Sequence, residues 1–301
     1  MNKYVKYTII GILILIIILA LIFLNINKRN KDNKNDTKTK IVTSFYPMYI
    51  IAENLLEGTK NTELVNMADV NVGCLHDYTL TTEDLKKVEN ADFFIINGLG
   101  MEKFLDKVIN SNSNMDIIDS SQNIQNIIEN EEETNPHIWT SIDNYISQVK
   151  NISKELQNKD KLNAQIYIEN EEKYVEKLEN LKEEYLETLK DLEGQKAIIL
   201  NEAFEYLAQE LKLDYTTVKT DHEESTLSAE VLKNIIDKVK KENIKIIIID
   251  KNDNTSNAET IANETGAEIY KLNSGLTGSL DKDAYIKAME ENVRKGTGLF
   301  L

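Results

Sequence analysis

The stretch IKIIIIDKNDNTSNAETIANETGAEIYKLNS, residues 244–274, decides the fold class. Its first residues, 244–249, are apolar except for Lys245, and residues 268–272 form a second strand candidate. Between them, residues 258–265 have helical character and end at Gly266, the residue type that commonly follows the last turn of a helix. A strand, a helix and a second strand in this order join parallel strands, so the stretch predicts a parallel β-sheet covered by helices.

The same alternation runs through the rest of the chain from residue 41. The predicted strands are residues 41–44, 63–67, 93–96, 116–118, 196–200 and 215–218, and the predicted helices are residues 49–56, 82–90, 102–109, 203–211, 229–242 and 282–293. Strand–helix units repeated on both sides of one long helical segment are typical of an α/β protein. We therefore expect two doubly wound parallel-sheet lobes joined by one long rigid helix.

The long helical segment covers residues 163–192. Apolar residues spaced by three, four or seven mark one stripe along it: Tyr167, Tyr174, Leu178, Leu181, Tyr185, Leu189 and Leu192. A single stripe fits a coiled-coil dimer and equally a helix that lies along two lobes, and the strand–helix units on each side favour the second. We predict a monomer with an N-terminal lobe at 41–154, a linking helix at 155–194 and a C-terminal lobe at 195–301.

Residues 9–24 are apolar with a single glycine, and Lys3 and Lys6 precede them. As a helix they would be about 24 Å long, which nearly spans a ~30 Å hydrocarbon core. A cleavable signal peptide is the alternative, but neither an A-x-A site nor a cysteine for lipid attachment directly follows the run. We predict a signal-anchor helix at 1–27 and a polar tether at 28–40, which hold the protein at the cell membrane.

The orientation in the membrane is ambiguous by charge. Six basic residues follow the apolar run within the tether and two precede it, and the positive-inside rule would place the body in the cytoplasm. The rule weakens when a large domain follows the span, so the side on which the body lies depends on the resemblance described below.

Composition and missing motifs exclude several classes of function. The chain carries 35 Lys and Arg against 51 Asp and Glu, a formal net charge of −16, so its charge would not attract nucleic acid. Cys74 is the single cysteine, which excludes an intramolecular disulfide and a cysteine-based structural zinc site. No nucleophile elbow, H-E-x-x-H, P-loop or G-x-G-x-x-G motif is present, and we predict that the protein is not an enzyme.

All three histidines, His76, His137 and His222, fall in loops after predicted strands. Ligands of open α/β sheets bind beyond the carboxyl ends of the strands. Imidazole is the commonest neutral metal ligand and suits zinc, and Asp77 and Asp221 stand beside two of the three histidines. A single loop histidine is usually just solvated, but three in one class of position indicate a metal site.

Several motifs, taken in order, resemble the zinc and manganese solute-binding proteins of metal ABC importers (the cluster A-I type). They are CLHDY at 74–78, NGLGME at 97–102, NPHIW at 135–139, EAFEYLA at 202–208 and LSA at 227–229. The resemblance covers residues 41–294. It implies two α/β lobes joined by a long helix, a metal ion held in the cleft, a body on the extracellular side and an ABC transporter permease as partner.

The resemblance also implies a ligand set. The first two ligands would be His76 and His137. The third and fourth family positions hold Asn201 and Asn273 here, where the family has a histidine or glutamate and an acidic residue. Amide oxygens bind zinc weakly compared with imidazole or carboxylate, so His222 and Glu202 are the candidate substitutes.

The function that the resemblance implies is capture of a divalent metal ion and its delivery to the permease. The expected cargo is Zn2+. The alternatives are a manganese or iron binder, or a degenerate family member that acts as a surface adhesin.

Overall fold

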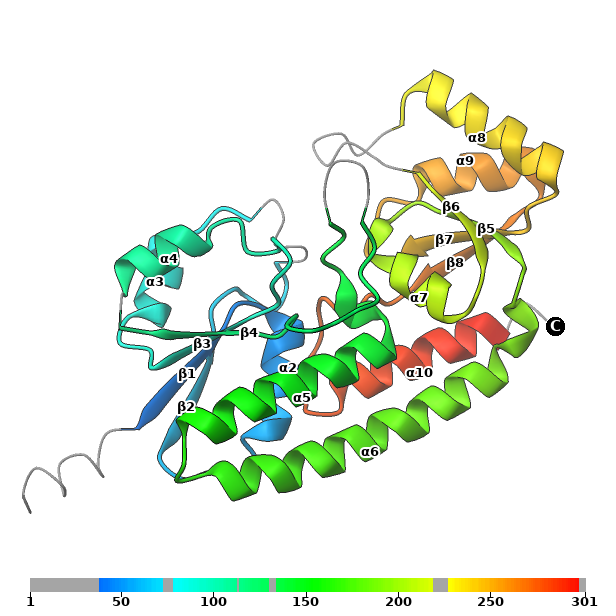
Figure 1. Ribbon diagram of the computed structural model, residues 1–301. Helices are drawn as coiled ribbons and strands as arrows, with labels where there is room; N and C mark the ends of the chain where they lie inside the picture. Colours follow the sequence, from blue (N-terminus) through cyan, green and yellow to red (C-terminus); the bar gives the residue numbers. More distant parts are fainter. Residues whose placement is uncertain (1–37, 73–77, 113, 130–133, 219–226, 298–301) are drawn as a thin grey trace, which may run out of the picture. The chain divides into compact units, whose positions relative to one another are not determined.

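The computed structural model describes residues 38–72, 78–112, 114–129, 134–218 and 227–297 (Figure 1). The chain divides into a small unit, Met1–Thr39 with Asn61–Glu63, and a large unit, Lys40–Lys60 with Leu64–Leu301, to which nearly everything below belongs. The predicted anchor at 1–27 lies outside the described residues. Among the described helices, none is both long and apolar enough to cross a membrane.

The first sheet has the strand order β2-β1-β3-β4. Its strands are β1 (Thr39–Thr43), β2 (Thr62–Asn66), β3 (Phe93–Ile96) and β4 (Asp116–Asp119), and the helices between them are α2 (Tyr46–Leu55), α3 (Thr82–Val88) and α4 (Leu105–Ser111). β3 pairs in parallel with β1 and with β4. All four residues of β3 are buried, as expected for a strand covered on both faces.

The second sheet repeats this arrangement in the order β6-β5-β7-β8, with every pair parallel. Its strands are β5 (Lys196–Ile199), β6 (Asp214–Thr217), β7 (Ile246–Asp250) and β8 (Glu268–Leu272), and its helices are α7 (Glu205–Glu210), α8 (Ala229–Glu242), α9 (Ser256–Thr265) and α10 (Ala284–Thr297). In each sheet the order reverses once, between β1 and β3 and between β5 and β7. Both sheets are therefore doubly wound, and the predicted fold class is confirmed.

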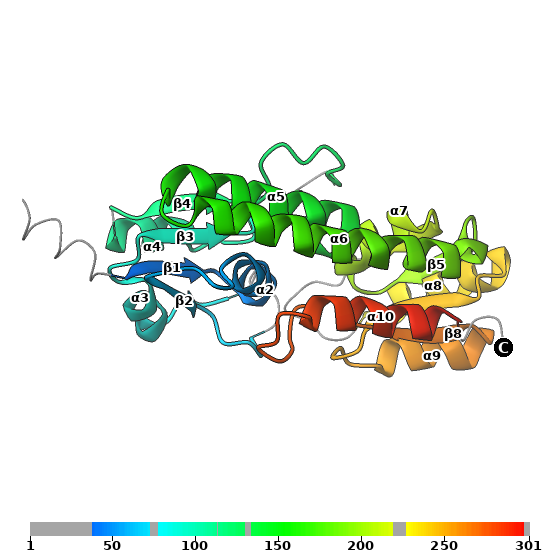
Figure 2. The same cartoon turned by 90° about the horizontal axis from the view of Figure 1, so that it is seen from below.

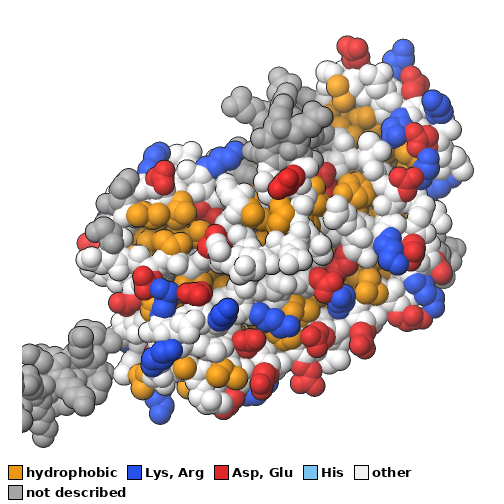
Figure 3. Space-filling view, in the orientation of Figure 1, with side chains coloured by type: hydrophobic (Ala, Val, Ile, Leu, Met, Phe, Trp, Pro, Cys, Tyr) orange, Lys and Arg blue, Asp and Glu red, His pale blue; other side chains and the backbone are white. Residues whose placement is uncertain are grey.

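Two long helices separate the sheets in the chain, α5 (Ile142–Lys159) and α6 (Ala164–Thr188). The predicted stripe is the buried face of α6, which contacts α2, α5 and α10. Figures 1 and 2 both show α6 running alongside α5. On the face seen in Figure 3, acidic and basic side chains intermingle over these helices. One ion pair joins the two helices, with Lys182 Nζ of α6 2.6 Å from Asp143 Oδ1 of α5.

The segment predicted as one linking helix from 155 to 194 is interrupted between α5 and α6. Asp160 Oδ1 accepts the backbone N–H of Leu162, and Asn163 Nδ2 donates to Asp160 Oδ2. A side chain such as that of Asp160, which binds nearby backbone, competes with helix continuation, so the chain turns here without a proline or glycine. After α6, the short 3-10 helix η2 (Lys190–Leu192) leads into β5.

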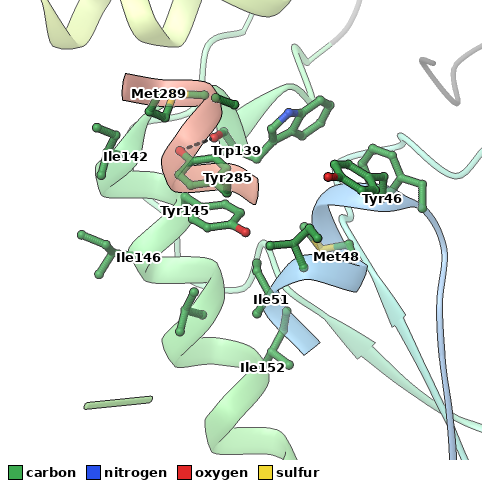
Figure 4. Close-up of a cluster of buried hydrophobic side chains, with 14 of the residues drawn as sticks. Tyr46, Met48, Ile51, Trp139, Ile142, Tyr145, Ile146, Ile152, Tyr285 and Met289 are labelled. Carbon is green, nitrogen blue, oxygen red and sulfur yellow. Dashed lines mark hydrogen bonds between the residues drawn. The ribbon is translucent and has the colours of Figure 1, made fainter. Parts of the chain in front are cut away.

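One hydrophobic core joins elements from both ends of the chain (Figure 4). Tyr145 of α5 stacks on Tyr285 of α10 with ring centroids 3.6 Å apart and an interplanar angle of 8°. Tyr285 Oη donates to the carbonyl of Trp139, which lies in the 3-10 helix η1 (Ile138–Thr140), at 2.8 Å. Met48 and Ile51 of α2 lie in the same cluster. Among the described helices, α10 therefore completes a core that α2 begins.

The loop after β3 has an unusual backbone. Gly98, Leu99 and Gly100 all have positive φ, at 88°, 53° and 80°. This conformation turns the backbone N–H groups of Asn97 and Gly98 toward the carboxylate of Glu102, at 2.8 and 3.1 Å. Glu102 was predicted to open a helix, but α4 begins only at Leu105, because the Glu102 side chain instead folds back onto this loop.

We expect Gly98→Ala to lower the free energy of unfolding by at least about 2 kcal/mol, measured by urea denaturation followed by circular dichroism. An added Cβ would overlap Asp119 Oδ1 and Ser121 Oγ, in addition to the cost of the positive φ. Gly100→Ala is the matched control, since φ is +80° there and no atom lies within 4 Å of the added Cβ. It should cost only about 1 kcal/mol, and equal losses in the two variants would contradict the steric argument.

Candidate metal site

His137 lies in the N-P-H motif just before η1 and is 3% exposed. Its carbonyl accepts the hydroxyl of Thr140 at 2.9 Å, and the Ile138 N–H closes a tight turn onto the Pro136 carbonyl at 2.8 Å. These local bonds fix the backbone that carries the imidazole. His137 is buried and lies on a rigid turn at the end of the first α/β unit. This position fits a metal ligand better than it fits a solvated loop residue.

Asn97, at the end of a strand of the first sheet, binds the N-P-H motif through a hydrogen bond. Asn97 follows β3 directly, and its Nδ2 donates to the Pro136 carbonyl at 2.9 Å. Gln148 of α5, which is fully buried, donates from Nε2 to Asn97 Oδ1 at 3.0 Å and to Ser120 Oγ at 2.8 Å. A buried amide network therefore ties the motif to the carboxyl ends of β3 and β4.

The same motif is also bound to the second half of the chain. Tyr206 Oη donates to the Asn135 carbonyl and Thr140 Oγ1 donates to the Ala203 carbonyl, both at 2.6 Å. Trp139 Nε1 donates to the Ser274 carbonyl at 2.8 Å. His137 was predicted to lie on the N-terminal lobe, and its motif in fact makes hydrogen bonds to residues of both sheets' α/β units.

Glu202 is an acidic neighbour of this histidine. Its Oε1 lies 3.9 Å from His137 Nδ1, and its side chain is 20% exposed. Glu202 also opens the 3-10 helix η3 (Glu202–Phe204), where an acidic residue is favoured by the helix dipole. It thus has both a structural role and a position suited to binding a cation beside His137.

Asn201 adjoins Glu202 but uses both ends of its amide locally. Its Oδ1 accepts the Ala203 N–H at 3.0 Å as the N-cap of η3, and its Nδ2 donates to Asp253 Oδ2 at 2.8 Å. Asp253 is an acidic residue that the sequence analysis did not single out. Its position just after a predicted strand could have indicated it, since ligands of open α/β sheets bind beyond the carboxyl ends of the strands.

Asn273 directs its side chain toward α10. Its Nδ2 donates to Glu291 Oε2 and its Oδ1 accepts the Gly275 N–H, both at 3.0 Å. Its backbone is bound on both sides by the amide of Asn292. Asn273 is 7% exposed, so this amide serves to fix the turn after β8 against the last helix.

The structure therefore brings His137 and Glu202 together, with Asn201 next to them and Asn273 turned to α10. The predicted ligands His76 and His222, with their neighbours Asp77 and Asp221, lie outside the described residues. Within the described ranges, no group of three or more His, Cys, Asp or Glu side chains is arranged to hold a metal ion.

Known proteins resemble this chain over nearly its whole body. Residues 41–295 match the family described as zinc-uptake complex component A, periplasmic (ZnuA). The manganese-binding lipoprotein MntA of Halalkalibacterium halodurans is 29% identical over 264 residues, which are 84% of this chain and 86% of the relative. The high-affinity zinc uptake system protein ZnuA of Bacillus subtilis is 29% identical over 279 residues, 85% of this chain and 86% of the relative.

A solved structure shares the fold. The solute-binding protein FpvC of Pseudomonas aeruginosa in complex with Mn2+ superposes with a TM-score of 0.78 at 25% identity, over 87% of this chain and 98% of that chain. The family match confirms the resemblance found in the motifs. The family is a metal-binding component of a transport system and not an enzyme. The chain therefore belongs to the zinc-uptake complex component A family of metal solute-binding proteins.

Proposed function

We propose that this protein captures a divalent metal ion, zinc, outside the cytoplasm and delivers it to the permease of an ABC importer. The single observation that carries the proposal is the buried imidazole of His137 with the Glu202 carboxylate 3.9 Å away, in a motif that belongs to a metal-uptake family. Imidazole and carboxylate are together a donor set that suits zinc.

The proposed ligands are His76 and His137, with His222 and Glu202 as the substitutes for the two amides. Asn201 and Asn273 support this choice because their amides already bind Asp253, Ala203, Glu291 and Gly275. Three imidazoles favour zinc, whereas two imidazoles with Glu202 would also tolerate manganese or iron. If the chain has no metal site, the alternative is a degenerate family member that acts as a surface adhesin.

The metal site is tested by replacing His137. We expect His137→Ala to weaken zinc binding by at least about tenfold, or 1.4 kcal/mol, in a competition titration with a chromophoric chelator. His76→Ala should weaken zinc binding to the same extent. His222→Ala and Glu202→Gln, measured separately, show which of these two residues replaces the amides as a ligand. Unchanged zinc affinity in the His137 variant would rule out the proposed ligand set. Elemental analysis of the purified chain reports which metal it carries.

We also propose that the body, with lobes at 41–154 and 195–301 and the linking segment at 155–194, faces the extracellular side as a monomer. Residues 1–27 would anchor it in the cell membrane. In support, MntA of Halalkalibacterium halodurans is itself a lipoprotein and the matching family is periplasmic. Protease added to intact cells is expected to remove the body from the cell-associated fraction. A body that is degraded only after lysis would contradict this location.

A further inference from the structure

Asn135 lies between the imidazole of His137 and a carboxylate on α7. Its Oδ1 is 2.8 Å from His137 Nδ1 and also accepts the His137 backbone N–H at 3.0 Å. Its Nδ2 donates to Glu205 Oε2 at 2.8 Å and to the Glu202 carbonyl at 3.0 Å. Asn135 and Glu205 are 2% and 5% exposed, so water cannot readily replace these partners.

These contacts permit one orientation of the Asn135 amide. The opposite orientation would turn its NH2 group onto the His137 backbone N–H, a donor against a donor. It would also turn its oxygen onto the Glu205 carboxylate and the Glu202 carbonyl, an acceptor against two acceptors. Asn135 Oδ1 therefore faces the imidazole, because the hydrogen-bond network distinguishes the oxygen of this amide from its nitrogen.

The orientation of the amide determines the tautomer of the histidine. An amide oxygen can only accept, so His137 Nδ1 must carry the proton, and the lone pair of the neutral ring is then on Nε2. Hydrogen bonds of this kind orient metal-ligating histidines and raise their basicity. The buried Glu205 carboxylate strengthens the effect because it polarises the Asn135 amide from the far side.

We propose that Asn135 and Glu205 are positioning residues that hold His137 as an Nε2 metal ligand. The inference rests on the proposed function for its link to metal, but the tautomer itself is a property of the metal-free protein. It also assigns to α7, an element of the second sheet's α/β unit, a role in shaping a ligand that the sequence placed in the first lobe.

The experiment is a long-range 1H–15N correlation spectrum of the full chain, free of metal, at about pH 8, which is above the ordinary pKa of free imidazole. Only three histidines contribute signals, and the His137→Gln variant assigns the one of interest. We expect His137 to show the Nδ1–H tautomer in the parent protein and to lose that preference in Asn135→Ala. An Nε2–H tautomer in the parent would overturn the proposal without reference to any variant.

Zinc titration then links the tautomer to binding. Asn135→Ala should weaken zinc binding about 10- to 100-fold. Glu205→Ala should weaken it less, and Glu205→Gln, which can still offer an oxygen to Asn135 Nδ2, should restore most of the loss. Gln209→Ala, at an exposed position of α7, is the matched control and should leave both tautomer and affinity unchanged.

The outcomes distinguish this proposal from the proposed function. Parent-like zinc affinity in Asn135→Ala, with affinity lost in His137→Ala, overturns the positioning role and leaves the metal function standing. Unchanged affinity in both variants overturns the metal role of His137 itself, while the metal-free spectrum still shows whether Asn135 sets the tautomer. Thermal unfolding of each variant checks that the chain is folded.

Discussion

Tyr285→Ala is expected to lower the free energy of unfolding by about 3–5 kcal/mol, the range for removing a large aromatic side chain from a core. Tyr285 is 3% exposed, and its ring stacks on Tyr145 with centroids 3.6 Å apart. The loss includes the stacking contact and the cavity that remains between α5 and α10. The measurement is urea denaturation at fixed pH, followed by circular dichroism.

Tyr285→Phe is the matched control. It keeps the ring but removes the donor that the Trp139 carbonyl accepts at 2.8 Å. Leaving a buried carbonyl without this bond costs about 1–3 kcal/mol, so the phenylalanine variant should fall between the parent and the alanine variant. A loss below about 1 kcal/mol for Tyr285→Ala would mean that α10 does not share the core of α5.

Glu102 should make the protein less stable as the pH rises from about 5 to about 7. Burial raises the pKa of the Glu102 carboxyl from 4.5 to about 7, against the opposing effect of hydrogen bonds from Asn97, Ser44 and Gly98. Below about pH 4.5 the group is protonated in both the folded and unfolded chains and contributes no difference. Between 4.5 and 7 the unfolded chain releases the proton that the folded chain keeps, so unfolding becomes more favourable.

Above about pH 7 the penalty is constant and on the order of 3 kcal/mol. Glu102→Gln removes this dependence, because its amide does not titrate. The free energy of unfolding should therefore decrease more between pH 5 and pH 8 in the parent than in Glu102→Gln. The other carboxyl groups titrate in both proteins and cancel in the comparison. Parallel pH profiles would contradict the shifted pKa.

Residue patterns predicted the strands and the long helix well, because both are repetitive. The run at 244–249 became β7, all of whose residues are buried, and the residues of the predicted stripe from Tyr167 to Tyr185 line the buried face of α6. The break between α5 and α6 was missed, since it depends on the Asp160 side chain, which accepts the Leu162 backbone N–H and the Asn163 side-chain amide. Single side-chain hydrogen bonds of this kind do not produce a repeating pattern of residues in a sequence.

The candidate site was predictable only in part. The N-P-H motif drew attention to His137, and adjacency drew attention to Glu202. The partners of Asn135, in contrast, lie 67 and 70 residues away along the chain, at Glu202 and Glu205. Asp253 and Asn201 are likewise separated by 52 residues. The proximity of Asp253 to Asn201 follows from the pairing of β5 with β7, which composition and spacing do not specify.

The position of α10 affects how the protein folds during synthesis. Domains generally fold as units in the order in which they leave the ribosome. Here α10 contacts α2 and α6, and just before it Ser279 and Lys282 accept hydrogen bonds from Tyr46 and Asn54 of α2. The first half of the chain therefore cannot complete its interior until α10 has been made. The nascent chain therefore stays short of its native state until the residues of α10 have left the ribosome.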